Sequence, residues 1–327
     1  MAQTLSEAAD THWSAQGRTI RPKVVDNFFE KYPTVAKFRT SAMRMVDTGG
    51  RGIEVHVRTS GGTAGTFSEY DVLDKSPINP VESAFYNKRY YYHPIILSDT
   101  ESWENAGPEK RFDEMAELRE VAMEGILKAI NEDIYGAQSG KSILGFQDHI
   151  ADAAGATVGG INSSTTTAWE NQRSTSSATF LTQSNTNVFD GIDRWNDVLD
   201  LCRIAKGRPR NLFTTWSIVK AYRIALSSQG YARTTVENAG GIGGPQNPPF
   251  YDMDVIADND CTALHSYFHD PDAIKMAIMS KVNFRKTPFV TLQSNGQLAQ
   301  LAYMVAGVQM QNVARRSNGV ATAITGT

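Results

Sequence analysis

The stretch PEKRFDEMAELREVAMEGILKAINEDIYG, residues 108–136, carries the strongest helical pattern in the chain. Pro108 suits a first helical turn, acidic residues follow it, and Gly136 suits a helix end. Apolar side chains recur close to the helical period at Phe112, Met115, Ala122, Ile126, Ile130 and Ile134. The stretch therefore predicts one helix over 108–135, which at 1.5 Å per residue is about 40 Å long.

Two β-prone runs precede this helix. In RGIEVHVRT (51–59), Ile53, Val55 and Val57 alternate with polar residues, and VESAFYNKRYYYHPIIL (81–97) forms the second run. The segment between them is rich in glycine and turn residues and contains Lys75. We predict a long two-stranded ribbon over 48–98. Because an isolated hairpin is marginal in water, we expect it to lie on another copy of the chain.

The residues after the helix mix both kinds of element. GFQDHI (145–150) is interpreted as a strand, 189–207 and 214–230 as amphipathic helices, and 208–215 as a strand between them. Short strands are expected within 252–258, 264–270 and 273–279, followed by a long β-prone run over 298–320. The order shows no βαβ rhythm, which favours an α+β fold.

The N-terminal segment, residues 1–47, is a polar arm. Within it, VVDNFFEKYPTVAKF (24–38) predicts a short helix interrupted at Pro33. Its large apolar side chains need cover from the body of the chain or from a neighbour: Phe28, Phe29, Tyr32 and Phe38.

Composition narrows the functional classes. The chain has 327 residues, a net charge of -3 and two cysteines, Cys202 and Cys261, far apart in sequence. The near-neutral charge gives no global attraction to nucleic acid, and the cysteines suggest neither a disulfide framework nor a zinc site. No signal peptide or membrane-spanning run is evident, so we expect a cytosolic or virion-borne protein without a membrane partner.

Motifs that suggest chemistry depart from their patterns. GAQSGKS (136–142) follows a predicted helix and has Tyr135 where a phosphate-binding loop needs glycine. Cys261, His265 and His269 would share a face only on a helix, and their segment predicts strand and turn. We therefore expect no cofactor, no metal and no catalytic residues, and we expect that the protein is not an enzyme.

Four stretches, taken in order, resemble the major capsid protein family of tailed bacteriophages, which has the Hong Kong 97-type coat fold. They are YNKRYYYHPIILSDTE (86–101), GGINSSTTTAWENQR (159–173), MDVIADNDCTALHSYFHDPDAIKMAI (253–278) and YMVAGVQMQNVARRSNGV (303–320). The resemblance covers nearly the whole chain. One departure is Asp252, where many relatives have glycine before the strand that starts near Met253.

The resemblance implies an N-terminal arm (1–47), an extended β-hairpin (48–98), a peripheral domain with the long helix (99–189), a mainly axial domain (190–285) and a return to the peripheral domain (286–327). It also implies self-assembly into hexamers and pentamers of an icosahedral shell around double-stranded DNA. The expected partners are a separate scaffolding protein, a portal and a decoration protein. Assembly is expected in the host bacterial cytoplasm.

The site residues expected from this reasoning are contact residues, because aromatic side chains dominate interface energetics. The expected intersubunit contacts are Phe28, Phe29, Tyr86, Tyr90, Tyr92, Arg315 and Arg316. For each aromatic residue the alternative is the chain's own core. For the two arginines the alternatives are non-specific contact with DNA phosphates and plain solvation. Arg18, Arg21 and Lys23 are the candidates for facing DNA phosphates. Lys75 is a candidate for a covalent cross-link. The alternative functions are an encapsulin-like compartment shell, an enzyme or a tail subunit.

Overall fold

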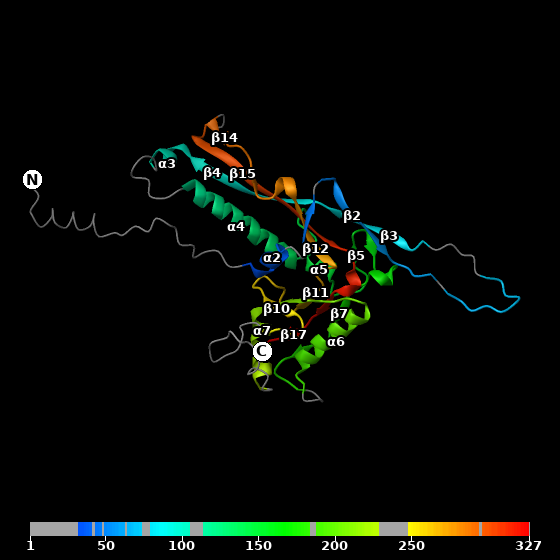
Figure 1. Ribbon diagram of the computed structural model, residues 1–327. Helices are drawn as coiled ribbons and strands as arrows, with labels where there is room; N and C mark the ends of the chain where they lie inside the picture. The colour runs from blue at the N-terminus through cyan, green and yellow to red at the C-terminus, as the bar shows by residue number, and fades with distance from the viewer. Residues whose placement is uncertain are drawn as a thin grey trace, which may run out of the picture.

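The computed structural model describes residues 32–40, 43–47, 49–62, 64–73, 79–104, 114–183, 188–228, 248–293 and 296–326. Two sheets organise them (Figure 1). The larger has six strands and lies against the long helix α4 (Glu114–Tyr135). The smaller has five strands and carries helices α6 (Asp190–Ile204) and α7 (Trp216–Ser228). Helices and strands are mixed without a repeating order, so the α+β prediction is confirmed.

The larger sheet is built around the long strand β15 (Ala299–Asn312). On one side of β15 lies β4 (Arg89–Ser98), antiparallel from the pair Arg89–Val308 to the pair Ser98–Ala299. On the other side β12 (Ile274–Met279), β13 (Arg285–Lys286) and β14 (Val290–Thr291) pair with it in turn. β1 (Arg44–Asp47) adds to β12 in parallel.

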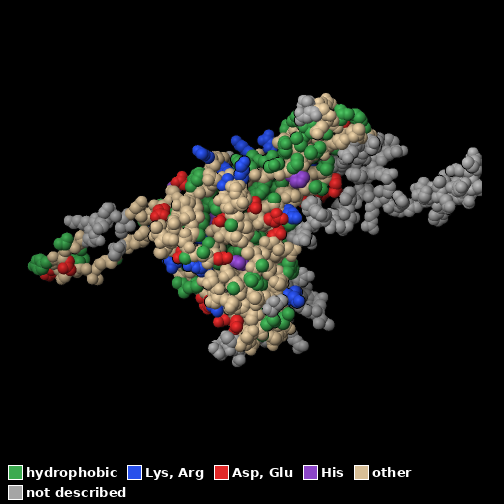
Figure 2. Space-filling view, turned by 180° about the vertical axis from the view of Figure 1, so that it is seen from behind, with side chains coloured by type: hydrophobic (Ala, Val, Ile, Leu, Met, Phe, Trp, Pro, Cys, Tyr) green, Lys and Arg blue, Asp and Glu red, His purple; other side chains and the backbone are tan. Residues whose placement is uncertain are grey.

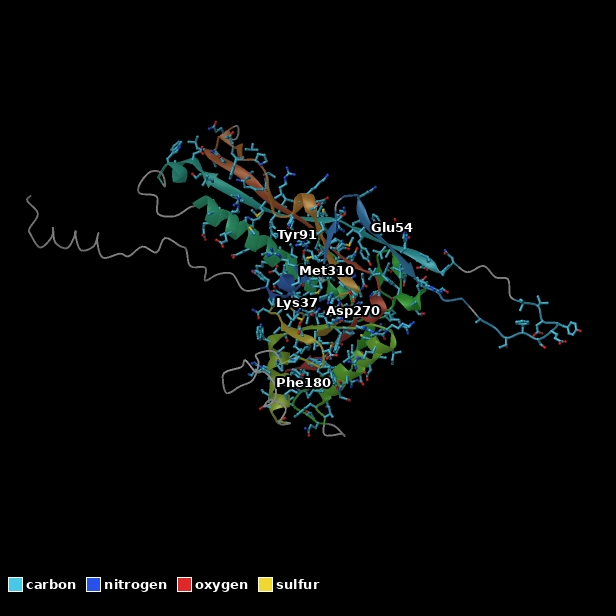
Figure 3. All side chains as sticks on the ribbon, viewed as in Figure 1. Lys37, Glu54, Tyr91, Phe180, Asp270 and Met310 are labelled. Atoms are coloured by element: carbon cyan, nitrogen blue, oxygen red, sulfur yellow. The ribbon has the colours of Figure 1, made fainter. Side chains whose placement is uncertain are left out.

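The helix α4 covers one face of this sheet. Ile126, Ile130 and Ile134 are each no more than 2% exposed and pack with alternate residues of β15. Tyr91 of β4 points to the same side, where its hydroxyl donates to Asp133 Oδ2 of α4 at 2.5 Å, and Figure 3 labels it with Met310 of β15. The predicted helix end at Tyr135 is confirmed. Its predicted start at Pro108 lies outside the described residues.

The smaller sheet is buried on both faces, and period-two alternation divides its residues between two cores. Its strand order is β10 (Asp254–Ala257), β9 (Asn211–Thr214), β11 (Ser266–His269), β16 (Gly319–Ala321) and β7 (Gln172–Ser174). Leu212 and Phe268 face α6 and α7, in the core that contains Phe180. Phe213 and Tyr267, one residue away, face the core of α4 and the larger sheet. One shared core therefore joins the two sheets.

The ribbon has two strands at its base. β2 (Gly52–Arg58) pairs antiparallel with β3 (Val81–Asn87), and the chain between them projects far from the body (Figure 1). The predicted return strand over 81–97 was wrong in one respect, because it divides at Lys88. The Lys88 ammonium donates to Gly49 O at 2.6 Å and pairs with Asp47, so the chain turns there from the ribbon into the larger sheet.

Three further segments can be compared with the predictions. GFQDHI is not a strand, because residues Phe146–His149 form the short helix α5. Gly145 caps it: its N–H donates to the Asp148 carboxylate, and its carbonyl oxygen accepts from the N–H groups of Asp148 and His149. Pro33 begins α2 (Pro33–Phe38), since a proline is tolerated in a first turn, and the part of the predicted helix before Tyr32 lies outside the described residues. The strand predicted within 273–279 forms as β12 and pairs with β15 in the larger sheet, whereas β10 and β11 before it in the chain belong to the smaller sheet.

Smaller elements complete the description. They are α3 (Asp99–Glu104), β5 (Thr157–Val158), β6 (Ile161–Asn162), η2 (Thr167–Trp169), β8 (Ala178–Thr179), η4 (Ser280–Val282), η6 (Arg315–Ser317) and β17 (Ile324–Thr325). Among the described residues, no helix is long and apolar enough to span a membrane.

Candidate assembly surfaces

The ribbon is anchored to the body by its own small core. Ile53 and Val57 of β2 and Ala84 and Tyr86 of β3 pack with Trp169 of η2. Tyr86 is fully buried, and its hydroxyl donates to Asn312 O at 2.9 Å. The expectation that Tyr86 contacts another subunit is therefore wrong, because the chain's own core encloses the ring.

Arg315 is also enclosed by its own chain. It is 1% exposed, and its guanidinium donates to four carbonyl oxygens, those of His149 at 2.8 Å, Ala156 at 3.1 Å, Asp148 at 3.2 Å and Trp169 at 3.4 Å. These donations tie the residues after α4 to the end of β15. Burial lowers the pKa of Arg315 to about 10, so it stays charged at neutral pH. Arg315 is therefore a structural residue and not an intersubunit contact as expected.

Tyr90 and Tyr92 lie on a different surface from the one predicted. They belong to β4 rather than the ribbon, and they are 58% and 70% exposed. Because Tyr91 points toward α4, alternation directs its two neighbours to the opposite face of the sheet. Tyr92 stands edge-on to Tyr303 of β15, with ring centroids 6.0 Å apart.

This exposed face continues along the sheet. Ile96 of β4, Leu301 of β15 and Val290 of β14 are register partners, as are Tyr92, Val305 and Arg285 further along. We call this surface the outer sheet face, defined by Tyr90, Tyr92, Ile96, Arg285, Val290 and Tyr303. Figure 2 shows hydrophobic side chains gathered at this end of the molecule, opposite the ribbon, with Lys and Arg side chains along the neighbouring edge.

The far end of the ribbon is the second exposed apolar surface. Phe67, Tyr70 and Val72 are 71%, 95% and 92% exposed, and Leu73 follows them. Glu69 and Asp71 are exposed between them. We call residues 67–73 the ribbon tip. The ribbon was expected to lie on another copy of the chain, but no residue of the tip was named as a contact, nor were Arg285 and Val290. The apolar residues in the loop sequence FSEYDVL were a visible signal for the tip.

Of the remaining residues predicted as contacts, one lies within the described part of the chain and the others lie outside it. Arg316 is exposed on η6, next to the buried Arg315. Phe28, Phe29, Arg18, Arg21, Lys23 and Lys75 lie outside the described residues. The three residues considered for a metal do not converge on one point. Cys261 is buried, His265 Nε2 bonds to Asp152 Oδ2 at 2.7 Å, and His269 Nε2 bonds to Ile274 O at 3.1 Å.

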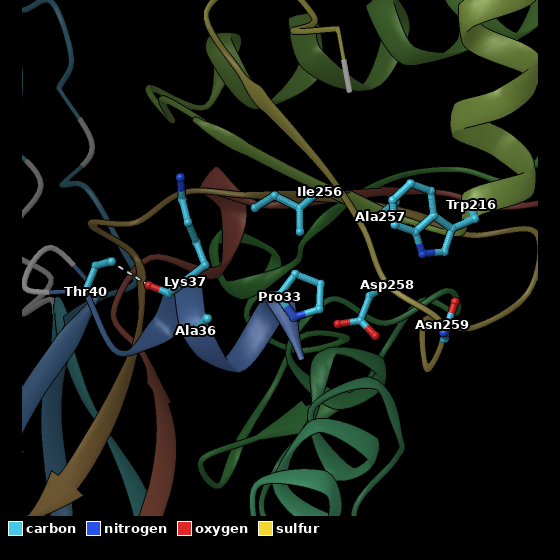
Figure 4. Close-up of a pocket in the computed structure, with 9 residues that line it drawn as sticks. All are labelled: Pro33, Ala36, Lys37, Thr40, Trp216, Ile256, Ala257, Asp258 and Asn259. Atoms are coloured by element: carbon cyan, nitrogen blue, oxygen red, sulfur yellow. Dashed lines mark hydrogen bonds between the residues drawn. The ribbon is translucent and has the colours of Figure 1, made fainter. Parts of the chain in front are cut away.

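An apolar pocket of about 510 Å³ lies where α2 meets β10 and α7. Figure 4 shows Pro33 and Ala36 on one wall and Trp216 and Ile256 on the other. At its edge Asp258 accepts from Thr34 Oγ1 at 2.6 Å and from Asn131 Nδ2 at 3.1 Å. Asp258 therefore joins α2 and α4 to the strand β10, which is a structural task rather than a reactive one.

No protein-family profile and no curated protein matches the chain. Solved structures do match over nearly its whole length. A chain of the cyanophage A-1(L) capsid asymmetric unit is 15% identical, with a TM-score of 0.74, covering 94% of this chain and 97% of that one. This is the fold of phage capsid chains.

Two other solved structures extend the capsid fold. A chain from the capsid of the native GTA particle is 12% identical, with a TM-score of 0.62, and covers 99% of this chain and 100% of that one. A chain of the SrpI encapsulin complex of Synechococcus elongatus is 8% identical, with a TM-score of 0.55, and covers 100% of this chain and 98% of that one. The capsid fold is therefore shared with an encapsulin, although the likeness to the cyanophage chain is greater.

Proposed function

We propose that this chain is the major capsid protein of a tailed bacteriophage, of the Hong Kong 97 type. It assembles as hexamers and pentamers into an icosahedral shell around double-stranded DNA. The observation that carries this proposal is the pair of exposed apolar surfaces at opposite ends of a chain with the capsid fold. Figure 1 shows the ribbon projecting away from the end that carries β14, so the two surfaces of one molecule do not meet.

Two different patches that meet between copies form a head-to-tail contact, and such a contact closes into a ring when its rotation allows. Charge supports the pairing of the ribbon tip with the outer sheet face. The tip carries Glu69 and Asp71, whereas the outer sheet face carries Arg285 with Lys286 beside it. Opposite charges around an apolar contact fix its register and disfavour like-to-like pairing.

The free energy of assembly comes from apolar area that is exposed in the single chain and buried between copies. Burying an aromatic side chain is worth about 1.5–3 kcal/mol, which must exceed the cost of association. The four apolar side chains of one tip together contribute about 6–12 kcal/mol, which is comparable with an association cost of roughly 4–15 kcal/mol. A closed shell repeats this contact for every subunit, and this repetition makes the assembled state stable.

Electron microscopy of the purified protein tests the proposal directly, with closed particles as the expected result. The double variant Phe67→Ser, Tyr70→Ser should greatly reduce their yield because the tip loses its apolar rings. The matched variant Tyr70→Phe keeps the ring and should assemble normally. A wild-type protein that forms no closed particles, either alone at high concentration or in infected cells, would contradict the proposed function.

We further propose that the shell assembles in the host bacterial cytoplasm with a separate scaffolding protein, a portal and a decoration protein. The packaged DNA is contacted non-specifically, in keeping with a net charge of -3. An encapsulin-like compartment is the alternative function, supported by the SrpI likeness. Particle contents separate the two, because a phage shell from infected cells contains DNA and a compartment contains protein.

A further inference from the structure

The apolar pocket between α2, β10 and α7 lies apart from the assembly surfaces described above, and we call it the α2 pocket. The helix α2 buries one face in the core, and its other face forms one wall of the pocket through Pro33, Ala36, Lys37 and Thr40. The facing wall carries Ile256 of β10 and Trp216 of α7, whose side chain is 44% exposed (Figure 4). A half-exposed tryptophan beside an apolar hollow is a typical anchor for a binding partner.

The polar groups of the pocket already have partners within the chain. Lys37 Nζ pairs with Asp254 Oδ2 at 2.5 Å, and Thr40 Oγ1 donates to Lys37 O at 2.5 Å. Asp258 accepts from Thr34 and Asn131, as described above. Since both charged side chains of the lining are paired in this way, the pocket favours an apolar occupant over a charged one.

The course of the chain brings one apolar occupant to this place. Residues 1–31 lie outside the described part of the chain, and they join the body beside the pocket. Tyr32 packs against the core of α4, and the next residue, Pro33, lines the pocket. Phe28 and Phe29 precede Pro33 by five and four residues. At about 3.3 Å per residue, both therefore lie within roughly 17 Å of Pro33 and can reach the pocket.

We propose that Phe28 and Phe29 of the N-terminal arm occupy the α2 pocket of their own chain. A volume of about 510 Å³ suits aromatic groups, and an aromatic ring packs well edge-on or offset against the ring of Trp216. The two rings thereby gain the cover that the polar arm does not provide. The docked pair also fixes the point at which residues 1–27 leave the body, and so determines where the rest of the arm can reach.

The tether favours the pair of the same chain over the pair of a second copy. A linker of four residues holds the rings beside the pocket at an effective concentration of about millimolar or more, which an arm from another molecule has to exceed. The inference therefore assigns Phe28 and Phe29 to their own chain rather than to the intersubunit contact expected from the sequence. It concerns the single chain and does not depend on the formation of shells.

Limited proteolysis of the intact chain tests this, at concentrations below those at which particles form. Chymotrypsin cleaves after Phe28 or Phe29 only while the ring is out of the pocket, so the rate reports the undocked population. Cleavage after Trp13, further along the same arm, is the internal reference, and mass spectrometry measures both rates.

Two variants remove the site from opposite walls. Ala36→Glu places a charge in the pocket, and Trp216→Ser removes the facing ring. Each should speed cleavage after Phe28 and Phe29 about tenfold relative to cleavage after Trp13. The matched control is Arg39→Glu, because Arg39 is exposed at the end of α2 and does not line the pocket. It should leave the relative rate unchanged.

Two results would overturn the inference. The first is the same relative cleavage rate in the wild type, Ala36→Glu and Trp216→Ser. The second is wild-type protection that disappears on dilution, because it would place the pair in the pocket of a second copy. Either result leaves the proposed capsid function intact, and a failure to form closed particles leaves this inference intact.

Discussion

Replacing Arg315 with methionine should cost more stability than replacing any exposed arginine. Methionine fills a similar volume but donates no hydrogen bond, so four carbonyl oxygens lose their donor. Two of these hydrogen bonds, to His149 O and Trp169 O, are buried, where water does not replace the guanidinium. A hydrogen bond to a charged group is worth about 1.5–3 kcal/mol, and the desolvation that Arg315 no longer needs offsets part of the loss.

We therefore expect Arg315→Met to lower the free energy of unfolding by about 4 kcal/mol, or the melting temperature by about 8 °C at about 2 °C per kcal/mol. Urea denaturation followed by circular dichroism measures it. The control is Arg316→Met, whose exposed side chain should change stability by less than about 0.5 kcal/mol. Arg315→Lys should lie between the two, because one ammonium does not reach all four carbonyls. A methionine variant within about 1 kcal/mol of wild type would refute the structural role of the guanidinium.

Three other outcomes follow from the structure. Tyr92→Ser should raise the protein concentration needed for particle formation about tenfold, because the shell no longer buries the aromatic ring and loses about 1.5 kcal/mol per contact. Light scattering measures this concentration. Unchanged assembly would argue against the outer sheet face as a contact surface. Burial lowers the pKa of His149 to about 3 and of His269 to about 4, from 6.5. The neutral forms of His149 and His269 stabilise the fold above pH 6.5, and together these two residues cost about 4 kcal/mol as pH falls from 8 to 5. His265 acts in the opposite sense, because burial lowers its pKa but the hydrogen bond to Asp152 raises it overall. Stability by urea denaturation should therefore be lower at pH 5 than at pH 8, and a flat profile would contradict this. Gly145→Ala should cost about 3 kcal/mol in thermal unfolding, since a Cβ there meets the carbonyls that end α4, whereas Gly65→Ala, with open space around it, should be silent.

The spacing of apolar residues predicted the longer helices and strands, in which the periodic pattern extends over many residues. The helix ending at Tyr135, the helices after 189 and 214 and the long strand near the C-terminus all follow from apolar spacing. The partners of the strands did not follow. Nothing in VESAFYNKRYYYHPIIL shows that the chain leaves the ribbon at Lys88, because that turn depends on Asp47 and Gly49, which lie far upstream.

The candidate contact residues were predicted less well for the same reason. Tyr86 and Tyr92 look alike in the sequence, and both belong to aromatic β-prone runs. Tyr86 is enclosed by Trp169 and Asn312, whereas Tyr92 is 70% exposed. Arg315 and Arg316 are adjacent and chemically identical, yet only the first points into a ring of carbonyls. Tertiary structure determines which residue of each pair is buried, and short-range sequence periodicity does not predict it.

The position of β15 in the chain has a consequence for biosynthesis. This strand pairs with β4, β12, β13 and β14, so the larger sheet lacks its centre until the ribosome has translated residue 312. Arg89 of β4, for example, cannot pair with Val308 of β15 until that residue has been synthesised. Contacts so distant in sequence form slowly. A nascent chain therefore exposes one side of α4 and the edge of β4 from their own synthesis until that of β15, and during this interval a chaperone has the most apolar surface to bind.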